Sequence, residues 1–249
     1  MKKLPLKDGF GYLITDRLTR FYLSGADIAE GYILYAANPL YFTDARYFFA
    51  AEKKLKNTGF TPVLFHGEED IKAAIKDCGI KELSVDYGTT TVKDFLRYET
   101  FGAKVVDCAD VLRESREIKT EKEIEEIKKA CAIAEKAVSY VFENVRAGIT
   151  EKELCALLEK EMVRLGADGP SFDTIVAFGE NAAVPHHETG DTALKENSVV
   201  LIDTGAKVGF YLSDITRTAF FGVPDKEFTD DYDAVLSANE TAEREIVAG

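Results

Sequence analysis

Two aspartates in the last quarter of the sequence, Asp203 and Asp214, are placed where they could bind a metal ion. Asp203 ends the apolar run 199–202, where a carboxylate is costly unless it is paired. The segment 198–221 reads as two arms of a hairpin, and a turn centred on the 208–209 peptide would set the two aspartates directly opposite each other. Their Cβ atoms would then be roughly 4.5–5.5 Å apart. Two carboxylates at that separation either share a proton or bracket a cation.

An all-oxygen site of this kind favours a divalent cation. Oxygen ligands suit Mn²⁺, Mg²⁺ or similar ions, and bridging carboxylates suit two ions about 3.5–4 Å apart. The alternative is a hairpin of different register, which would put one aspartate in the turn or on the solvent face. The spacing of the two residues does not decide between these interpretations.

Two of the three histidines, His186 and His187, are adjacent and follow Pro185. The proline favours extended geometry in the residue before it. Because neighbouring side chains of an extended segment diverge, at most one of the two histidines should face a given site. A neutral histidine beside a metal could donate a hydrogen bond to a developing oxyanion. The alternative is a pair of histidines on a surface loop, and the aspartate pair favours the catalytic interpretation. The third, His66, is predicted to be structural.

The composition is that of an ordinary globular protein. The chain has 249 residues, of which 46% are hydrophobic and 30% are charged, with a net charge of −13. These values exclude wholesale disorder, and the acidity gives no basic face for nucleic acid. No apolar run approaches the roughly 20 residues of a membrane span, and residues 1–8 lack the apolar core of a signal peptide. The four cysteines match no zinc spacing and are predicted to be reduced, those of the second half in buried helix positions. We therefore expect a cytoplasmic protein without a nucleic-acid or membrane partner.

The first 117 residues alternate strand-like and helix-like segments. Helices are predicted over 44–56 and 68–78. The predicted strands are short, rich in β-branched or aromatic residues and bounded by turn residues: 11–14, 31–36, 61–65, 83–86 and 103–106. This rhythm predicts an α/β domain built on a mixed sheet.

A different pattern begins near residue 118, where we place a domain boundary. Thr120 with Glu123, and Thr150 with Glu153, are capping boxes that each predict the start of a helix. An apolar stripe that includes Cys131 marks the buried face of the first helix. Strands are predicted over 172–178, 198–204 and 210–221. Apolar positions from Phe228 to Ile246 predict a last helix.

Five sequence blocks, taken in order, are similar to those of a known family. They are 41–47 (YFTDARY), 118–127, the segment 172–179 with 181–186, 203–206 (DTGA) and 213–218 (SDITRT). The chain resembles the Xaa-Pro aminopeptidase and Xaa-Pro dipeptidase (prolidase) branch of the pita-bread metallopeptidases. The resemblance implies a creatinase-like N-terminal domain over 1–117 and the N-terminal portion of a pita-bread α+β catalytic domain over 118–249.

The resemblance also implies roles for three residues. Asp203 would be a bidentate ligand of one metal ion, Asp214 would bridge two ions, and His186 would hold the substrate and stabilise the tetrahedral intermediate. The implied cofactor is a pair of divalent ions, with Mn²⁺ first and Co²⁺ or Zn²⁺ as alternatives. The implied reaction is hydrolysis of the bond between an N-terminal residue and a following proline. The implied assembly is a homodimer.

The sequence departs from the family pattern in one respect. The family takes one more histidine and two glutamates as metal ligands, and a further substrate-binding histidine, from a part that these 249 residues do not match. We therefore expect this chain by itself to be inactive and to expose a sheet edge. Two other functions stay open: an inactive peptide-binding module of the same fold, and a metal-free creatinase-like hydrolase.

Overall fold

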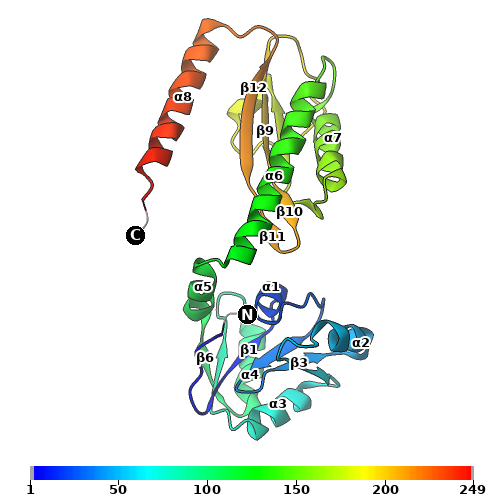
Figure 1. Cartoon of the computed structure of the whole chain (residues 1–249), viewed down its shortest axis with the longest axis vertical. Coiled ribbons are helices and arrows are strands. Elements are labelled where there is room, and N and C mark those ends of the chain that lie inside the picture. The colour runs from blue at the N-terminus through cyan, green and yellow to red at the C-terminus, as the bar shows by residue number, and fades with distance from the viewer. Residues whose placement is uncertain (1–2, 248–249) are drawn as a thin grey trace. The chain divides into compact units, whose positions relative to one another are not determined.

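The computed structural model describes residues 3–247. The chain folds as two compact units, Met1–Lys119 and Thr120–Gly249, each with its own hydrophobic core. In Figure 1 the first unit runs from blue to green and the second from green to red. Each unit is described by itself below.

The first unit is built on a six-stranded mixed sheet in the order β4-β3-β2-β1-β5-β6. Strand β2 runs antiparallel to β1 and β3, whereas the other five strands are parallel to one another. The strands are β1 Phe10–Ile14, β2 Tyr32–Tyr35, β3 Leu40–Thr43, β4 Thr61–Leu64, β5 Glu82–Val85 and β6 Lys104–Asp107. The predicted mixed sheet is confirmed, and β3 is a strand that the sequence pattern did not indicate.

Helices cover both faces of this sheet, because alternate strand residues point to opposite sides. Tyr12 and Ile14 of β1 pack with helices α1 Arg17–Ser24, α2 Ala45–Lys54 and α5 Ala109–Glu117. Leu13, between them, packs on the other face with α3 Glu68–Asp77, α4 Val92–Tyr98 and the 3₁₀ turn η1 Glu99–Phe101. Helices α2 and α3 were predicted. Helices α1, α4 and α5 were not.

Two helices open the second unit, α6 Glu121–Asn144 and α7 Glu151–Arg164. Both predicted capping boxes are confirmed: the side chains of Thr120 and Thr150 each accept the backbone N–H three residues on, and the glutamate returns the bond. The buried stripe of α6 runs through Ala130, Ala134, Ala137, Val138 and Val141. Cys131 is exposed. Its predicted burial is wrong because the stripe passes through the preceding alanine.

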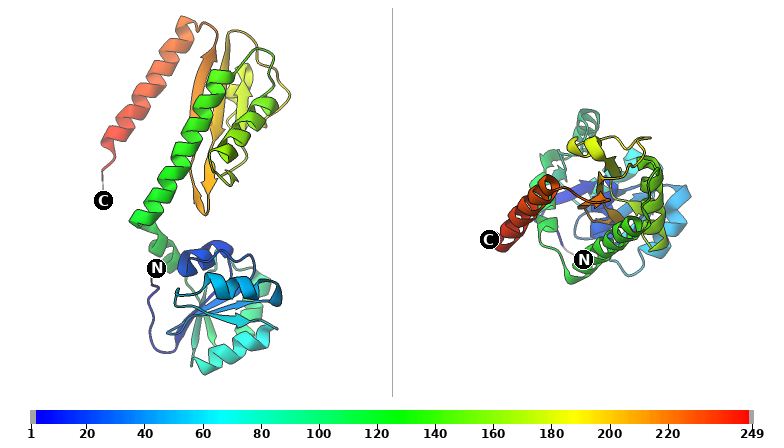
Figure 2. Two further views of the ribbon diagram at one scale, coloured as in Figure 1. Left: turned by 45° about the vertical axis from the view of Figure 1, so that its right-hand side comes forward. Right: turned by 90° about the horizontal axis from the view of Figure 1, so that it is seen from above.

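The strands of the second unit form two three-stranded sheets, β12-β9-β8 and β11-β10-β7. They are β7 Gly169–Pro170, β8 Ile175–Phe178, β9 Ser198–Thr204, β10 Ala206–Val208, β11 Tyr211–Leu212 and β12 Ile215–Phe221. Helix α6 contacts β10, β11 and β12, and α7 contacts β7 and β8 (Figure 2). The last helix, α8 Lys226–Glu245, has no buried residue and borders a groove beside β12, which is a sheet edge in the described part of the chain.

The hairpin that carries the two aspartates has a different register from the predicted one. Val208 pairs with Tyr211, so the turn is centred one residue later than expected, at Gly209-Phe210, and Gly209 takes the positive φ of 60° that the turn needs. When the centre of the turn moves by one residue, the cross-strand partner of every hairpin residue shifts by two positions. Asp203 therefore lies opposite Thr216, and the predicted direct pairing of Asp203 with Asp214 is wrong.

A close backbone contact interrupts the hairpin beside both aspartates. Gly205 separates β9 from β10, and a Cβ at this position would overlap the carbonyl oxygen of Ser213 and the hydroxyl of Ser171. The Ser171 hydroxyl donates to that same carbonyl at 2.7 Å, and the Ser213 hydroxyl accepts the N–H of Ala206 at 2.9 Å. Only glycine permits the two backbones to approach so closely.

We predict that Gly205→Ala destabilises the second unit by about 3 kcal/mol or more, at the upper end of overpacking costs, because the new methyl group meets backbone atoms that cannot rotate away. Chemical denaturation would measure the change. Gly67→Ala is the matched control, since its added Cβ would meet nothing within 4 Å. Equal stability of the two variants would show that the contact at Gly205 is not tight.

Candidate functional site

Asp203 lies on β9, the central strand of its sheet, with Ile175 of β8 on one side and Thr216 of β12 on the other. Its neighbours Ile202 and Thr204 are buried, whereas Asp203 is half-buried. The alternation turns its carboxylate away from the core that α6 and α7 cover. The Thr216 hydroxyl donates to Asp203 Oδ1 at 2.7 Å. The carboxylate is thus held at one oxygen by a neighbouring strand.

Asp214 is exposed and precedes the first residue of β12. Its backbone is fixed by the preceding residue, because the buried hydroxyl of Ser213 donates to the carbonyl of Ala130 on α6 at 3.1 Å. Residues two apart on an extended strand point to the same face, so from the alternation of β12 we expect Asp214, just before the strand, to lie on the face of Thr216 and hence of Asp203. Cβ atoms at such diagonal positions are separated by up to roughly 7–8 Å. The two-residue change of register is therefore expected to leave Asp203 and Asp214 on the same face of the sheet but to increase the distance between them.

The two histidines have different surroundings. His186 is exposed in a turn after Pro185, whereas His187 is half-buried, with its Nε2 2.8 Å from Oε2 of Glu151. Among residues 3–247, no hydrogen bond or ion pair joins His186 to Asp203 or to Asp214. The structure therefore places Asp203 on β9 and Asp214 just before the neighbouring strand β12, and it leaves His186 on a separate loop.

Glu151, which the sequence pattern did not single out, organises this loop. Its carboxylate is fully buried. It accepts hydrogen bonds from the N–H groups of Phe178 and Gly190, each at 2.9 Å, and from the Asn181 amide at 2.8 Å, in addition to its contact with His187. Burial by itself would raise the pKa of Glu151, but these four bonds together hold it below its ordinary value.

The sequence held little signal for Glu151. It is the first residue of α7, where an acidic residue is explained by the helix dipole, and the adjacent capping box of Thr150 and Glu153 accounts for the acidic first turn. Its partners lie 27 to 39 residues further along the chain. Only the folded structure shows them together.

The chain following His187 is fastened to the same helix and sheet. The Thr189 hydroxyl bonds the N–H of Val176 at 2.9 Å and the carbonyl of Thr174 at 3.0 Å. The N–H of Glu151 donates to the carbonyl of Thr192 at 3.1 Å. The loop is therefore fixed from residue 187 onward, and His186 projects from the residue just before the anchor.

The aspartate pair has the chemistry of a partial metal site. Carboxylate oxygens suit hard or borderline divalent ions. Within residues 3–247, however, no group of three or more histidine, cysteine, aspartate or glutamate side chains is arranged to hold a metal ion. Asp203 and Asp214 thus fit as two ligands of a larger set.

Comparison with known families accounts for both units. The model of metallopeptidase family M24 matches residues 125–249, and the model of the creatinase/prolidase N-terminal domain matches residues 8–118. The chain belongs to metallopeptidase family M24. The predicted fold class is confirmed: a creatinase-type α/β domain with a mixed sheet, followed by the first part of a pita-bread domain.

Several M24 relatives are similar over most of the chain. The Xaa-Pro dipeptidase of Pyrococcus horikoshii is 38% identical over 237 residues, which cover 92% of this chain and 65% of that protein. The crystal structure of an X-Pro aminopeptidase from Thermotoga maritima has a TM-score of 0.86 at 34% identity and is matched over 68% of its length. The prolidase from Pyrococcus furiosus has a TM-score of 0.82 at 30% identity and is matched over 67% of its own length. The chain spans less than two thirds of the Pyrococcus horikoshii dipeptidase.

The described part of this M24 chain contains no helix that combines the length and the apolar character needed to cross a membrane. The roles of Asp203, Asp214 and His186 stay predictions, because the comparisons concern the fold and the family.

We predict that Glu151→Gln destabilises the second unit by about 2–4 kcal/mol at neutral pH, because an amide cannot accept all four donors. The difference in unfolding free energy between the variant and the wild type should become smaller as the pH is lowered. A carboxyl whose pKa is lowered by folding stabilises fully above its ordinary value of 4.5 and loses that contribution as the pH falls through the lower folded value.

Denaturant titrations of wild type and variant at several pH values would measure both effects, with the exposed Glu188→Gln as the matched control. A difference in unfolding free energy that stays constant from pH 7 to well below 4.5 would contradict a charged Glu151 in the folded state.

Proposed function

We propose that this protein is a metal-dependent peptidase that hydrolyses the bond between an N-terminal residue and a following proline. The observation that carries the proposal is the pair of carboxylates on β9 and just before β12: Asp203 is held by Thr216, and the backbone of Asp214 is held through Ser213. The Xaa-Pro dipeptidase and X-Pro aminopeptidase among the similar proteins support the choice of substrate class.

Asp203 and Asp214 would hold the metal in this proposal. The Thr216 hydroxyl occupies Oδ1 of Asp203, while Oδ2 accepts no hydrogen bond from any residue of the described chain and is available to a cation. A pair of divalent ions supplies Lewis-acid polarisation of the scissile carbonyl when bound. Mn²⁺ is the first candidate, with Co²⁺ and Zn²⁺ as alternatives, since oxygen ligands accept all three.

His186 is proposed to bind the substrate. Its exposed imidazole can donate a hydrogen bond to the carbonyl oxygen as negative charge develops there. The anchor of His187 on Glu151 fixes the backbone next to it, so the orientation of His186 depends on a neighbour that does no chemistry itself. We further propose that the protein acts in the cytoplasm as a homodimer on proline-containing peptides or dipeptides.

We propose that residues 1–249 by themselves do not complete the site, because the described part offers two carboxylates and no third ligand. With Mn²⁺ added, this chain should show no EDTA-sensitive cleavage of an Xaa-Pro dipeptide or tripeptide. EDTA-sensitive cleavage would contradict the need for further ligands and would confirm the reaction class.

In the complete enzyme, His186→Ala should lower kcat by about 10²–10³, the usual loss when one oxyanion donor is removed, with unchanged metal content. The neighbouring variant His187→Ala is the matched control: it should lower the unfolding temperature through Glu151 and have the smaller effect on kcat. The reverse pattern of kcat losses would assign the catalytic role to His187. Unchanged turnover in both variants would show that neither histidine takes part in the mechanism.

A further inference from the structure

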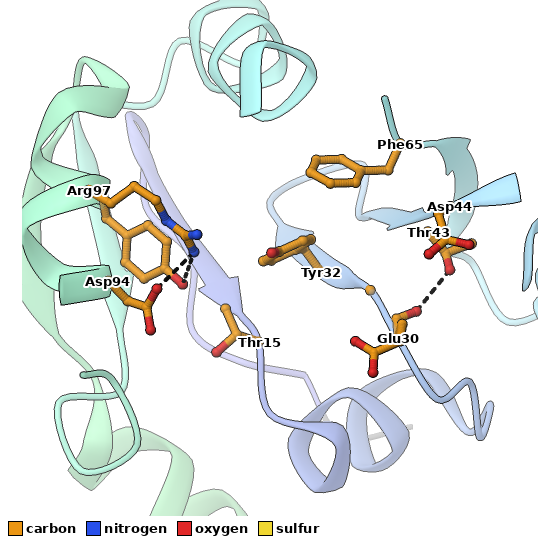
Figure 3. Close-up of a pocket in the computed structure, with 10 residues that line it drawn as sticks. Thr15, Glu30, Tyr32, Thr43, Asp44, Phe65, Asp94 and Arg97 are labelled. Carbon is orange, nitrogen blue, oxygen red and sulfur yellow. Dashed lines mark hydrogen bonds and ion pairs between the residues drawn. The ribbon is translucent and has the colours of Figure 1, made fainter. Parts of the chain in front are cut away.

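A pocket of about 390 Å³ lies in the first unit, where parallel strands of its sheet end (Figure 3). Thr15 follows β1, Thr43 ends β3, and Phe65 follows β4. The chain leaves β3 through α2 to the outer strand β4, and then crosses through α3 to β5 on the far side of β1. A crevice at the carboxyl ends of strands, where connections diverge in this way, is the usual ligand position of α/β sheets.

The pocket has an aromatic wall. The rings of Tyr32 and Phe65 are 5.2 Å apart between centroids and tilted by 49°. The backbone beside Tyr32 is held tightly, because Gly31 leaves no room for a Cβ against the carbonyl oxygen of Phe42 and the Thr43 hydroxyl donates to the carbonyl of Glu30 at 2.8 Å. The wall is thus formed by two aromatic rings, and the backbone beside Tyr32 is firmly held.

Arg97 of α4 provides a cation with free hydrogen-bond donors. Its Nη2 is 3.1 Å from Oδ1 of Asp94 and donates to the Tyr98 hydroxyl at 3.2 Å. Its buried Nε has no hydrogen-bond acceptor among the described residues, and the carboxylate of Glu68 is 3.6 Å away. A guanidinium group has five N–H donors in a planar fork that matches a carboxylate. In Figure 3 this group points toward Tyr32.

Glu30 provides the opposite charge across the pocket from Arg97 (Figure 3). Two other carboxylates of the lining are already paired, Asp44 with Arg46 at 2.7 Å and Asp94 with Arg97. The exposed carboxylate of Glu30 forms no hydrogen bond or ion pair within residues 3–247. The pocket therefore presents the carboxylate of Glu30 and, facing it across an apolar surface, the guanidinium of Arg97, which is ion-paired with Asp94 and Glu68 but has an Nε–H without a hydrogen-bond acceptor among the described residues.

We propose that this pocket binds a small zwitterion of the α-amino acid class with an apolar side chain. Its carboxylate would pair with Arg97, its ammonium group with Glu30, and its side chain would lie on Tyr32 and Phe65. The volume lies toward the lower end of the ~300–1,000 Å³ of small-molecule sites, as suits a ligand of this size. The inference rests on the first unit alone and is independent of the proposed peptidase activity.

The test is a titration of the full chain with L-leucine, followed by backbone amide NMR shifts. Saturable shifts at Gly31, Tyr32 and Phe65 are expected at millimolar or lower ligand concentration. L-leucinamide, which lacks the carboxylate, and 4-methylpentanoate, which lacks the ammonium group, should each bind at least about tenfold more weakly, since each loses one charged hydrogen bond.

Two variants locate the site. Glu30→Gln and Arg97→Lys should each weaken L-leucine binding by about tenfold or more, the latter because lysine keeps the charge and loses the fork. Glu52→Gln, an exposed acid of the same unit outside the pocket, is the matched control and should bind as wild type. Thermal unfolding of Arg97→Lys verifies that the domain is folded.

Three results would overturn the proposal. The first is the absence of a saturable shift with L-leucine up to about 10 mM, because a site with two charged contacts should bind more tightly than that. The second is an analogue, either L-leucinamide or 4-methylpentanoate, that binds as tightly as L-leucine. The third is wild-type affinity for L-leucine in both Glu30→Gln and Arg97→Lys.

Discussion

The backbone contact between Gly205 and Ser213 is the constraint on which the candidate metal site depends. It joins β9–β10 to the segment before β12 at a distance that no side chain permits. Ser213 is tied from there to Ala130 of α6, so the long helix, the central strand and the edge strand share one fixed point. Asp203 lies two residues before this point and Asp214 one residue after it. Their relative positions follow from packing, with no direct bond between them.

A buried charge performs the corresponding task for the histidine loop. The Glu151 carboxylate is costly to bury, and four donors from β8, the 3₁₀ turn η2 Gly179–Ala183 and the loop offset that cost. Removing it would leave buried N–H groups without acceptors. One carboxylate at a helix start thus holds a loop that comes some 35 residues later in the chain. Glu151 thereby fixes the backbone next to the exposed side chain of His186 without contacting that side chain.

Local signals predicted the elements, and long-range packing decided the site. The capping boxes at Thr120 and Thr150 are each formed within four consecutive residues, so all of their interactions can be predicted from the local sequence. The hairpin register depends on which residues turn, and a turn at Gly209-Phe210 or at Val208-Gly209 is compatible with the same alternation. The role of Glu151 depends on partners far away in sequence. The aspartates and His186 were therefore identifiable as residue types in a pattern, while their separation and their support were not.

The central claim is that Asp203 on β9 and Asp214 just before β12 form one oxygen-ligand site. A Mn²⁺ titration of the chain, followed by paramagnetic broadening of backbone amide signals, tests it most directly. The account predicts broadening first at residues 203 and 214–216, its loss in Asp214→Asn, and its persistence in Asp233→Asn, which removes an exposed acid of α8. Broadening confined to the acidic residues of α8, or unchanged broadening in Asp214→Asn, would contradict the claim.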